Sequence, residues 1–434
     1  MSNKAEKINN VFLNRNFRLV FFGALVSDLG ATLYSFAVSF YILEISGNNA
    51  FLQGLYLALC GIAVLLFTLV GGVLGDRVSK SKIMYVCDYL KGGMILLATL
   101  LMLLFPSAPA QLVILFVLGI LGNMVSGVFA PAAGALFPDI IKEEQLQQAN
   151  AYFTMKNALQ GILGIILAGI LYALLPIHAL FLLVGACYLA SGISEMMIRY
   201  EFHPSPERLT MKRAFRDLSD GFRYLTDQKA ILAMLAAILF INFFFVPLSG
   251  NFLPFFVKTG LAEAPSYLFD NILTPEQWSS AFEVCVGIST LIGAAILSGR
   301  EQADHCGKKV AGLLCAIAAV LILLTIGYVV WVDRSSQINV FLISLSLGFF
   351  AIGFLVTGIN IPISTLIMRV VDKDKLSKVN SLTSIGSQGM IPIASVLAGG
   401  ILKVFGSSAL LAFCSLGFTV TAVAMLFNPH IREL

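Results

Sequence analysis

The amino-acid sequence predicts an all-α membrane protein with twelve transmembrane helices in two parallel six-helix pseudo-repeats. Composition, the length of the apolar runs and an internal repeat each indicate this fold. Of the 434 residues, 58% are hydrophobic and only 12% are charged, whereas a soluble domain usually carries about 25% charged residues because its surface faces water. Most of the surface of this chain therefore faces something other than water.

The apolar residues are gathered into runs such as Phe51–Leu74 and Ala409–Phe427. Runs of about 20 residues cross a ~30 Å hydrocarbon layer as a helix, because each residue adds ~1.5 Å. We predict helices at residues 17–43, 51–74, 83–105, 111–137, 150–175, 179–199, 229–257, 278–299, 309–332, 338–368, 379–403 and 409–428.

The basic residues predict the orientation of these spans. Nearly all of the 28 Lys and Arg residues, Lys156 among them, are assigned to the side that holds both termini. The exceptions are Lys91, Lys258, Arg334 and Lys403. Because cytoplasmic loops are enriched in Lys and Arg, we expect both termini in the cytoplasm and the chain in the cell membrane, the inner membrane of a bacterium.

An internal repeat divides the chain into two halves. Leu146 corresponds to Leu376 and Gly169 to Gly399, a difference of 230 residues in each case. Six predicted spans separate the copies, so the halves have the same orientation, an architecture typical of transporters with a substrate site near the bilayer midplane. The predicted segments are a six-helix bundle at 1–199, a cytoplasmic linker at 200–228 and a six-helix bundle at 229–434. Within the linker, residues 210–224 form either an amphipathic surface helix or a flexible tether.

The sequence contains no motif of a soluble or membrane enzyme. It has no metal-binding cluster of His and Cys, no Ser-His-Asp signature and no phosphate-binding glycine loop. The basic residues are spread through short loops, which argues against nucleic-acid binding. We therefore expect no catalytic residues, no metal and no cofactor, and a monomer whose partners are a small substrate, protons and membrane lipid.

The loop after the second predicted span resembles the signature loop of the major facilitator superfamily. It reads Gly71-Gly72-Val73-Leu74-Gly75-Asp76-Arg77 and continues with basic residues. Two further segments look like the macrolide-efflux and multidrug branch of that superfamily: Asn242 to Pro247, and Phe137-Pro138-Asp139. The resemblance covers nearly the whole chain.

The resemblance implies alternating access of two bundles around a cavity lined by the first, fourth, seventh and tenth helices. It also implies a gating role for Gly72, Gly75, Asp76, Arg77 and Asp139. Asp76 would lie at the positive N-terminal end of the eleventh helix, and Arg77 would pair with Asp139. The alternative is that these residues only fix topology and folding.

Three features depart from the family pattern. The fourth helix has Gly122-Asn123 where the family has an arginine within the membrane, and the fifth helix lacks the Gly-Pro pair of antiporters. Both departures weaken the prediction of proton antiport. The loop from Lys258 to Gln277 is longer than in the efflux branch, and its end, Thr274 to Gln277, is typical of a helix cap.

Charged residues inside the predicted spans are candidate sites, because an ionised side chain there costs several kcal/mol. Asp28 lies near the bilayer centre, so we expect it to face the cavity and bind protons or cations; the alternative is a structural carboxylate. Glu283 is the second candidate for proton or cation coupling. Asp88 and Lys91 are one helical turn apart and can neutralise each other, although Lys91 is also a candidate partner of Asp28. Glu195 is interpreted as structural.

Polar and aromatic side chains on the cavity helices predict the character of the substrate. The predicted cavity residues are Asp28, Asn123, Asn242, Phe243, Phe244 and Phe245. Pro247 and Pro254 remove backbone donors and should bend the seventh helix. A mostly apolar cavity with few polar groups favours a bulky amphipathic substrate over a sugar or a nucleotide.

The sequence therefore predicts a secondary active transporter that exports amphipathic or hydrophobic small molecules, of the drug or macrolide type, in exchange for protons. One alternative is a lipid or lysophospholipid translocator of the same fold, because an apolar cavity also fits an acyl chain. Another is a non-transporting sensor or assembly factor, for which two repeated halves would be superfluous.

Overall fold

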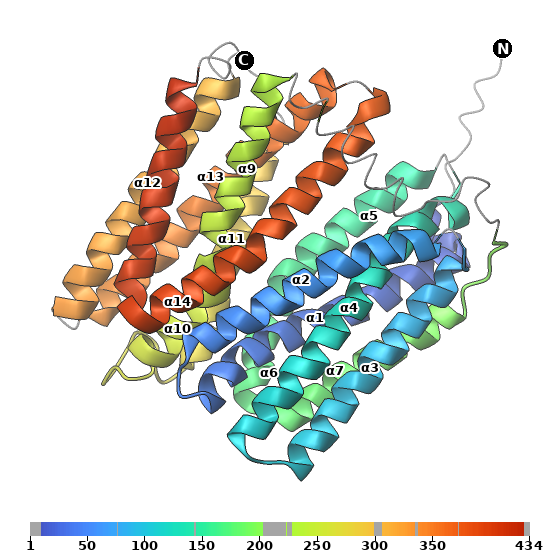
Figure 1. The fold of residues 1–434 in the computed structure, drawn as a ribbon, viewed down its shortest axis with the longest axis horizontal. Helices are drawn as coiled ribbons and strands as arrows, with labels where there is room; N and C mark the ends of the chain where they lie inside the picture. Colours follow the sequence, from blue (N-terminus) through green and yellow to red (C-terminus); the bar gives the residue numbers. More distant parts are fainter. Residues whose placement is uncertain are drawn as a thin grey trace. The chain divides into compact units, whose positions relative to one another are not determined.

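The structure is a computed structural model, and every regular element in its described part is a helix (Figure 1). The described residues are 10–75, 77–142, 145–202, 223, 228–298, 306–334, 337–371 and 373–428. Most of the predicted linker at 200–228, with the segment 210–224, lies outside these ranges, as does Asp76.

The helices of the first half follow one another with short connections. They are α1 (Arg15–Ile45), α2 (Ala50–Gly75), α3 (Lys80–Leu104), α4 (Ala108–Ile140), α5 (Leu146–Leu159), the π-helix η3 (Gln160–Gly164), α6 (Ile165–Leu174) and α7 (Ile177–Met196). A short 3-10 turn, η1 (Val11–Leu13), precedes them.

The second half contains more π-helical turns. Its elements are α9 (Lys229–Pro247), η4 (Leu248–Phe252), α10 (Leu253–Phe256), η5 (Val257–Leu261), α11 (Pro275–Ser298), α12 (Cys306–Gly327), η6 (Tyr328–Arg334), α13 (Ile338–Val370) and α14 (Lys373–Phe427).

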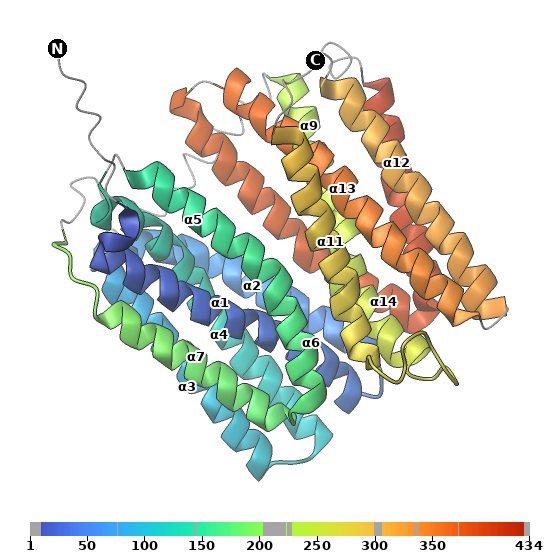
Figure 2. The ribbon, with the colours of Figure 1, turned by 180° about the vertical axis from the view of Figure 1, so that it is seen from behind.

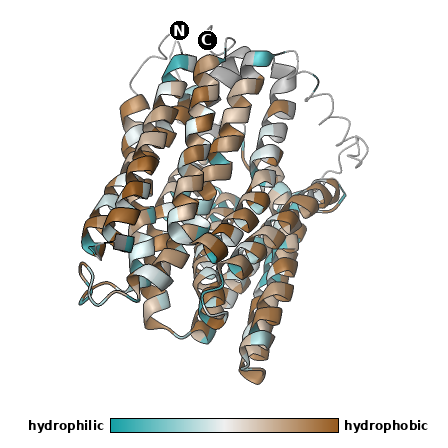
Figure 3. Ribbon diagram, turned by 60° about the vertical axis from the view of Figure 1, so that its left-hand side comes forward, coloured by the Kyte–Doolittle hydropathy of each residue, from teal (hydrophilic) through white to brown (hydrophobic). Residues whose placement is uncertain are grey.

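The described part holds 11 helices long and apolar enough to cross a membrane. One of them, α14, has 55 residues, but its backbone leaves the helical conformation at Gly406 (φ 79°, ψ −174°). Residues 373–405 and 407–427 are therefore two helices, and the twelve predicted spans are confirmed. Hydrophobic residues predominate along the helices (brown in Figure 3), as membrane-spanning helices require.

Gly406 is the residue at which α14 turns back, and its positive φ favours glycine. We expect Gly406→Ala to destabilise the protein by about 1–2 kcal/mol, because a Cβ in this conformation approaches the following carbonyl oxygen. Thermal unfolding in detergent measures the effect. Gly400→Ala is the control, since that glycine has no atom within 4 Å of an added Cβ and an ordinary helical φ. Equal melting temperatures of the two variants would contradict the expectation.

Two spans are interrupted by π-helical turns. In the fifth span, η3 separates α5 from α6; in the seventh, η4 follows Pro247 directly and η5 follows α10, which contains Pro254. Proline cannot donate to the carbonyl four residues before it, and for Pro254 this carbonyl belongs to Gly250, inside η4. The predicted bend of the seventh helix stays a prediction.

The predicted cap of the eighth span is confirmed. The Gln277 backbone N–H donates to Thr274 Oγ1 (3.4 Å), and the Thr274 N–H donates to Gln277 Oε1 (2.9 Å). These reciprocal bonds form a capping box at the start of α11.

The chain divides into two compact units. Unit 1 comprises Met1–Ala37, Ala63–Leu167 and Leu175–Met211; unit 2 comprises Val38–Ile62, Ala168–Leu174 and Lys212–Leu434. In unit 1, α3 lies beside α7 (Figure 2) and packs against α4. In unit 2, α11 packs on α13, and α14 packs on both α9 and α12. The predicted division into 1–199 and 229–434 stays a prediction.

Candidate functional site

An ion pair inside unit 1 joins the first and fifth spans. Lys156 Nζ donates to Asp28 Oδ2, and the side chains are 4% and 39% exposed, respectively. Asp28 lies thirteen residues after the start of α1 and Lys156 ten residues after the start of α5, or ~20 Å and ~15 Å along the helices. Both charges therefore lie within membrane-spanning helices.

The π-helix η3 positions a second polar layer beside this pair. Gln160, its first residue, donates to the Asp28 carbonyl oxygen (3.2 Å) and to Thr32 Oγ1 (3.1 Å). The Thr32 hydroxyl in turn donates to the Asp28 carbonyl oxygen (3.0 Å). π-Helical turns inside α-helices are frequent at functional sites, and here the turn places Gln160 against α1 one helical turn beyond Lys156.

The partner of Asp28 differs from the one that the sequence suggested. Lys91 lies 4.6 Å from the centroid of the Tyr188 ring, not at Asp28. Lys156, which the sequence analysis grouped with the loop cations, supplies the positive charge. A signal for it was present, because Lys156 follows the start of the predicted fifth span by more than one helical turn and Asp28 needed a cation at membrane depth.

The two sides of the ion pair differ in access to solvent. Lys156 is almost fully buried, with the Phe153 ring 5.3 Å from its Nζ, and a buried cation requires a counter-charge. Asp28 keeps more than a third of its side-chain surface exposed. The Asp28 carboxylate is therefore the exposed side of the pair and Lys156 the buried side.

The predicted gating residues lie at the end of α2 and the end of α4. Asp139 Oδ2 pairs with Lys80 Nζ (2.6 Å), not with Arg77, whose side chain is exposed. Lys80 is the first residue of α3 and follows Arg77 by three residues. The predicted Arg77–Asp139 pair is therefore wrong, and Lys80 is the partner of Asp139. Gly72 and Gly75 have no atom within 4 Å of an added Cβ. The gating role of this loop stays a prediction.

The predicted polar residues of the other cavity helices are committed to their own backbones. Asn123 donates to the Gly119 carbonyl oxygen and Asn242 to that of Ile238, each at 2.9 Å. Each amide keeps its oxygen and its second N–H for a ligand. Glu283 on α11 is half-buried and makes no hydrogen bond or ion pair with any residue that the structure describes.

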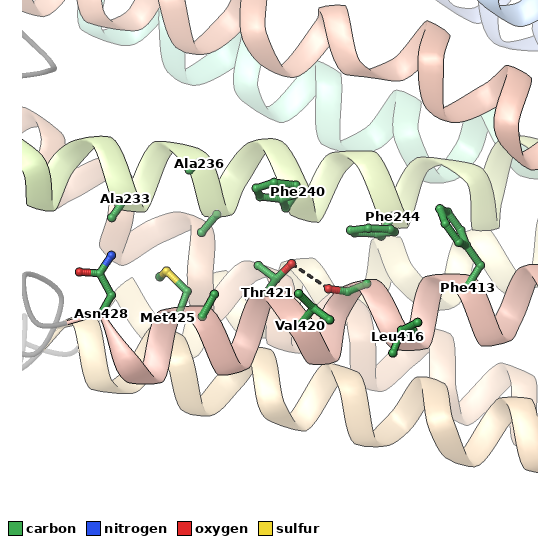
Figure 4. A pocket seen from close by; sticks show the side chains of 13 residues that line it. Ala233, Ala236, Phe240, Phe244, Phe413, Leu416, Val420, Thr421, Met425 and Asn428 are labelled. Carbon is green, nitrogen blue, oxygen red and sulfur yellow. Dashed lines mark hydrogen bonds between the residues drawn. The ribbon is translucent and has the colours of Figure 1, made fainter.

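Of the three predicted aromatic residues, Phe244 lines an apolar groove in unit 2 (Figure 4). Phe244 lies 5.0 Å from Phe243 and 5.4 Å from Phe413 between ring centroids; Phe245 is half-buried on the same helix. The groove has a volume of about 440 Å³ between α9 and the last part of α14. Its lining includes Ala233, Ala237, Phe240, Phe244, Leu416, Val420 and Asn428. Leu416 and Val420 are 65% and 59% exposed, so the groove lies on the apolar outer surface.

Lys258 connects three helix ends in unit 2, at the start of the long 258–277 segment. Its Nζ lies 2.9 Å from Glu276 Oε1 at the start of α11 and 3.4 Å from Glu44 Oε2 near the end of α1. The Tyr172 hydroxyl donates to the same Glu44 oxygen (3.3 Å). The segment thus begins and ends at one ionic cluster, which gives its unusual length a structural context.

We expect Lys258→Met to lower the free energy of unfolding by about 1–3 kcal/mol, because it leaves the mostly buried Glu276 carboxylate without its ionic partner. Glu263→Gln, an exposed change in the same segment, is the control and should be neutral. Thermal unfolding in detergent measures the effect, and added salt should change it little, because a mostly buried ion pair is weakly screened. Equal stability of the two variants would contradict this.

Comparison with known proteins agrees with this architecture. The family model of the Major Facilitator Superfamily matches residues 20–395. The chain is 22% identical over 387 residues to the uncharacterised MFS-type transporter YkuC of Bacillus subtilis, covering 86% of this chain and 82% of the relative. It is 22% identical over 249 residues to macrolide efflux protein A of Streptococcus pyogenes, covering 57% and 60%.

Solved structures share the fold at low sequence identity. A mutant of the nucleoside transporter NupG superposes with a TM-score of 0.70 at 11% identity, covering 95% of this chain and 100% of that one. A D-xylose–proton symporter gives 0.68 at 12% identity, covering 98% and 99%. A bacterial homologue of the iron transporter ferroportin gives 0.66 at 17% identity, covering 94% and 98%. With twelve spans, an intramembrane ion pair and a family model matched over most of its length, the chain belongs to the major facilitator superfamily of membrane transporters.

Proposed function

We propose that this protein is a secondary active transporter that exports amphipathic or hydrophobic small molecules in exchange for protons, by alternating access. The observation that carries the proposal is the Asp28–Lys156 ion pair within the first and fifth spans. A charge pair at this depth is costly, and charged residues in spanning helices are therefore usually kept for function.

The pair can couple proton movement to substrate movement because both compete for one carboxylate. A proton on Asp28 removes its negative charge and weakens its attraction to Lys156. A cationic substrate bound at Asp28 does the same by replacing Lys156 as the counter-ion. Proton and substrate therefore exclude each other at Asp28, which is the condition for exchange. Lys156 also supplies an intramembrane cation in a chain whose fourth helix lacks the family arginine.

The substrate class is proposed from the surfaces and from one relative. Macrolide efflux protein A, named for its substrate, is similar over 57% of this chain. The described polar groups on the cavity helices are few, and the Asn123 and Asn242 amide nitrogens are held by their own helices. Sites with much apolar surface and few polar groups suit bulky amphipathic molecules. We also propose that both termini are cytoplasmic and the protein lies in the cell membrane.

A second candidate function is translocation of a lipid or lysophospholipid. The groove between α9 and α14 favours it, since its exposed apolar rim offers an acyl chain a lateral position (Figure 4). The headgroup would then be recognised by polar residues such as Asn428 at the end of the groove.

The test is uptake into inverted vesicles that contain the protein. We expect a cationic lipophilic dye and a macrolide to accumulate while a pH gradient is imposed and to leak out when it is collapsed. Vesicles without the protein are the control. Movement of a fluorescent lysophospholipid between leaflets, without uptake of dye or macrolide, would overturn drug export and favour the second candidate.

A further inference from the structure

A second pair of acidic side chains is buried in unit 1, on helices other than those of the Asp28–Lys156 ion pair. Asp88 on α3 is 2% exposed and Glu195 on α7 is 0% exposed. The two helices pack closely here, since a Cβ on Gly192 of α7 would lie 2.9 Å from the Tyr89 ring on α3. Asp88 precedes Tyr89 in the chain and Glu195 follows Gly192 by three residues, so both carboxyl groups belong to this helix contact; they are called the Asp88–Glu195 pair.

The oxygens of this pair are not used by the fold. Among the described residues, none forms a hydrogen bond with Glu195 Oε1, Glu195 Oε2 or Asp88 Oδ2. The Ser191 hydroxyl, 1% exposed, interacts with Asp88 but does not reach hydrogen-bond geometry. A structural carboxylate is normally satisfied by donors, because an unpartnered buried one costs free energy. The unpartnered oxygens can therefore accept a hydrogen bond from an exchangeable donor.

The charges around the pair leave a deficit of one positive charge. On α3, Lys91 is the cation that interacts with Asp88, and Cys87 lies beside the pair. On α7, Tyr188 holds Lys91 over its ring; on α1, Asp28 faces the site but already has Lys156. Residues 108–137 of α4 contain no charged residue. Two carboxyl groups against Lys91 alone balance when one carboxyl carries a proton, because like charges this close do not both ionise.

A polar basin lies at one end of unit 1, next to the backbone of Glu195. The basin has a volume of about 630 Å³ and is lined by Ser79, Ser81, Lys82, Tyr85, Arg199 and Tyr200, among others. Ser81 lines the basin, and its hydroxyl donates to the Glu195 backbone carbonyl oxygen (2.9 Å). The basin lies where α3 begins and α7 ends, the side that we expect to be cytoplasmic.

We propose that Asp88 and Glu195 together bind one exchangeable proton, which reaches them through the basin at the start of α3. This site goes beyond the proposed function, because it neither uses Asp28 nor depends on the identity of the substrate. The proton lies on one of the two carboxyl groups, so the one remaining negative charge balances Lys91. Loss of the proton toward the basin leaves two negative charges between α3 and α7.

The test is infrared difference spectroscopy of the full-length protein in lipid while pH is changed without substrate. A protonated carboxyl group has a C=O stretch that disappears on ionisation. We expect wild type to lose such a band as pH rises, and Asp88→Asn and Glu195→Gln each to lack it. Asp28→Asn and the exposed Glu263→Gln should retain it, so the outcome is independent of transport activity.

Ser191→Ala is a further variant that keeps both carboxyl groups and should fold. It removes a polar neighbour of Asp88, so we expect the band to persist with a shifted titration midpoint. A wild-type band that is absent, or one that survives unchanged in both Asp88→Asn and Glu195→Gln, would overturn the proposal. A band lost only in Asp28→Asn would place the exchangeable proton at the first pair and overturn it as well.

Discussion

Asp28→Asn is expected to destabilise the protein by about 3–5 kcal/mol, the cost of leaving a buried charge without its partner. The buried partner is Lys156, whose side chain is only 4% exposed. Lys156→Gln should cost less, about 1–3 kcal/mol, because the Asp28 carboxylate that it abandons is 39% exposed and can be hydrated. The asymmetry follows from which side of the pair reaches water.

Reversible unfolding in mixed micelles measures both stabilities, and vesicle uptake measures transport. We expect gradient-driven uptake to fall to the detection limit in both variants, because each removes one partner of the exchange. The charge-swapped double variant, Asp28→Lys with Lys156→Asp, should recover part of the stability but not the uptake. Equal stability losses for the two single variants would contradict the structure around this pair. Uptake retained in Asp28→Asn would contradict the coupling role.

The fold was predictable because membrane helices are specified locally. Runs such as Phe51–Leu74 need only composition and length to be recognised, and the structure places that helix at Ala50–Gly75. The same holds for α14, where the apolar runs on either side of Gly406 predict two helices and the backbone leaves the helical conformation at that glycine.

The candidate site was predictable only in part, because partners depend on helix packing. Asp28 stood out by its depth in an apolar run, but nothing in one sequence says which helix faces it. The sequence therefore offers Lys91 as a possible partner, whereas the structure pairs Asp28 with Lys156. For the same reason the sequence alone does not place Glu195 on the helix that packs against α3.

The internal repeat has a physical explanation in the structure. Gly169 and Gly399, which correspond at an offset of 230, both allow close helix contacts in unit 2. A Cβ on Gly169 would lie 2.3 Å from Ser280 Oγ on α11. A Cβ on Gly399 would lie 2.5 Å from the Ala50 carbonyl oxygen at the start of α2. Equivalent glycines thus serve equivalent contacts, because membrane helices approach closely only where side chains are small.

The contact of Gly399 is the tighter test of function, because it is made with backbone atoms. Gly54 faces it from α2, and a Cβ on Gly54 would lie 2.3 Å from the Ser395 carbonyl oxygen. Backbone atoms cannot rotate aside, so Gly399→Val must push α2 and α14 apart. We expect this to destabilise the packed arrangement by about 1–3 kcal/mol, as other overpacked sites do.

In an alternating-access transporter, that energy changes the balance between conformations. If the contact exists in only one state, a 1–3 kcal/mol penalty shifts the ratio of states by about 5–150-fold. Spin-label distances between α2 and α14 should therefore lose the short component in Gly399→Val. Gly400→Val is the matched control on the neighbouring residue, where an added Cβ meets no atom within 4 Å. The same distance distributions in the two variants would show that the glycine contact does not select a conformation. A shift confined to Gly399→Val would show that the close contact between α2 and α14 at Gly399 sets the balance between conformations.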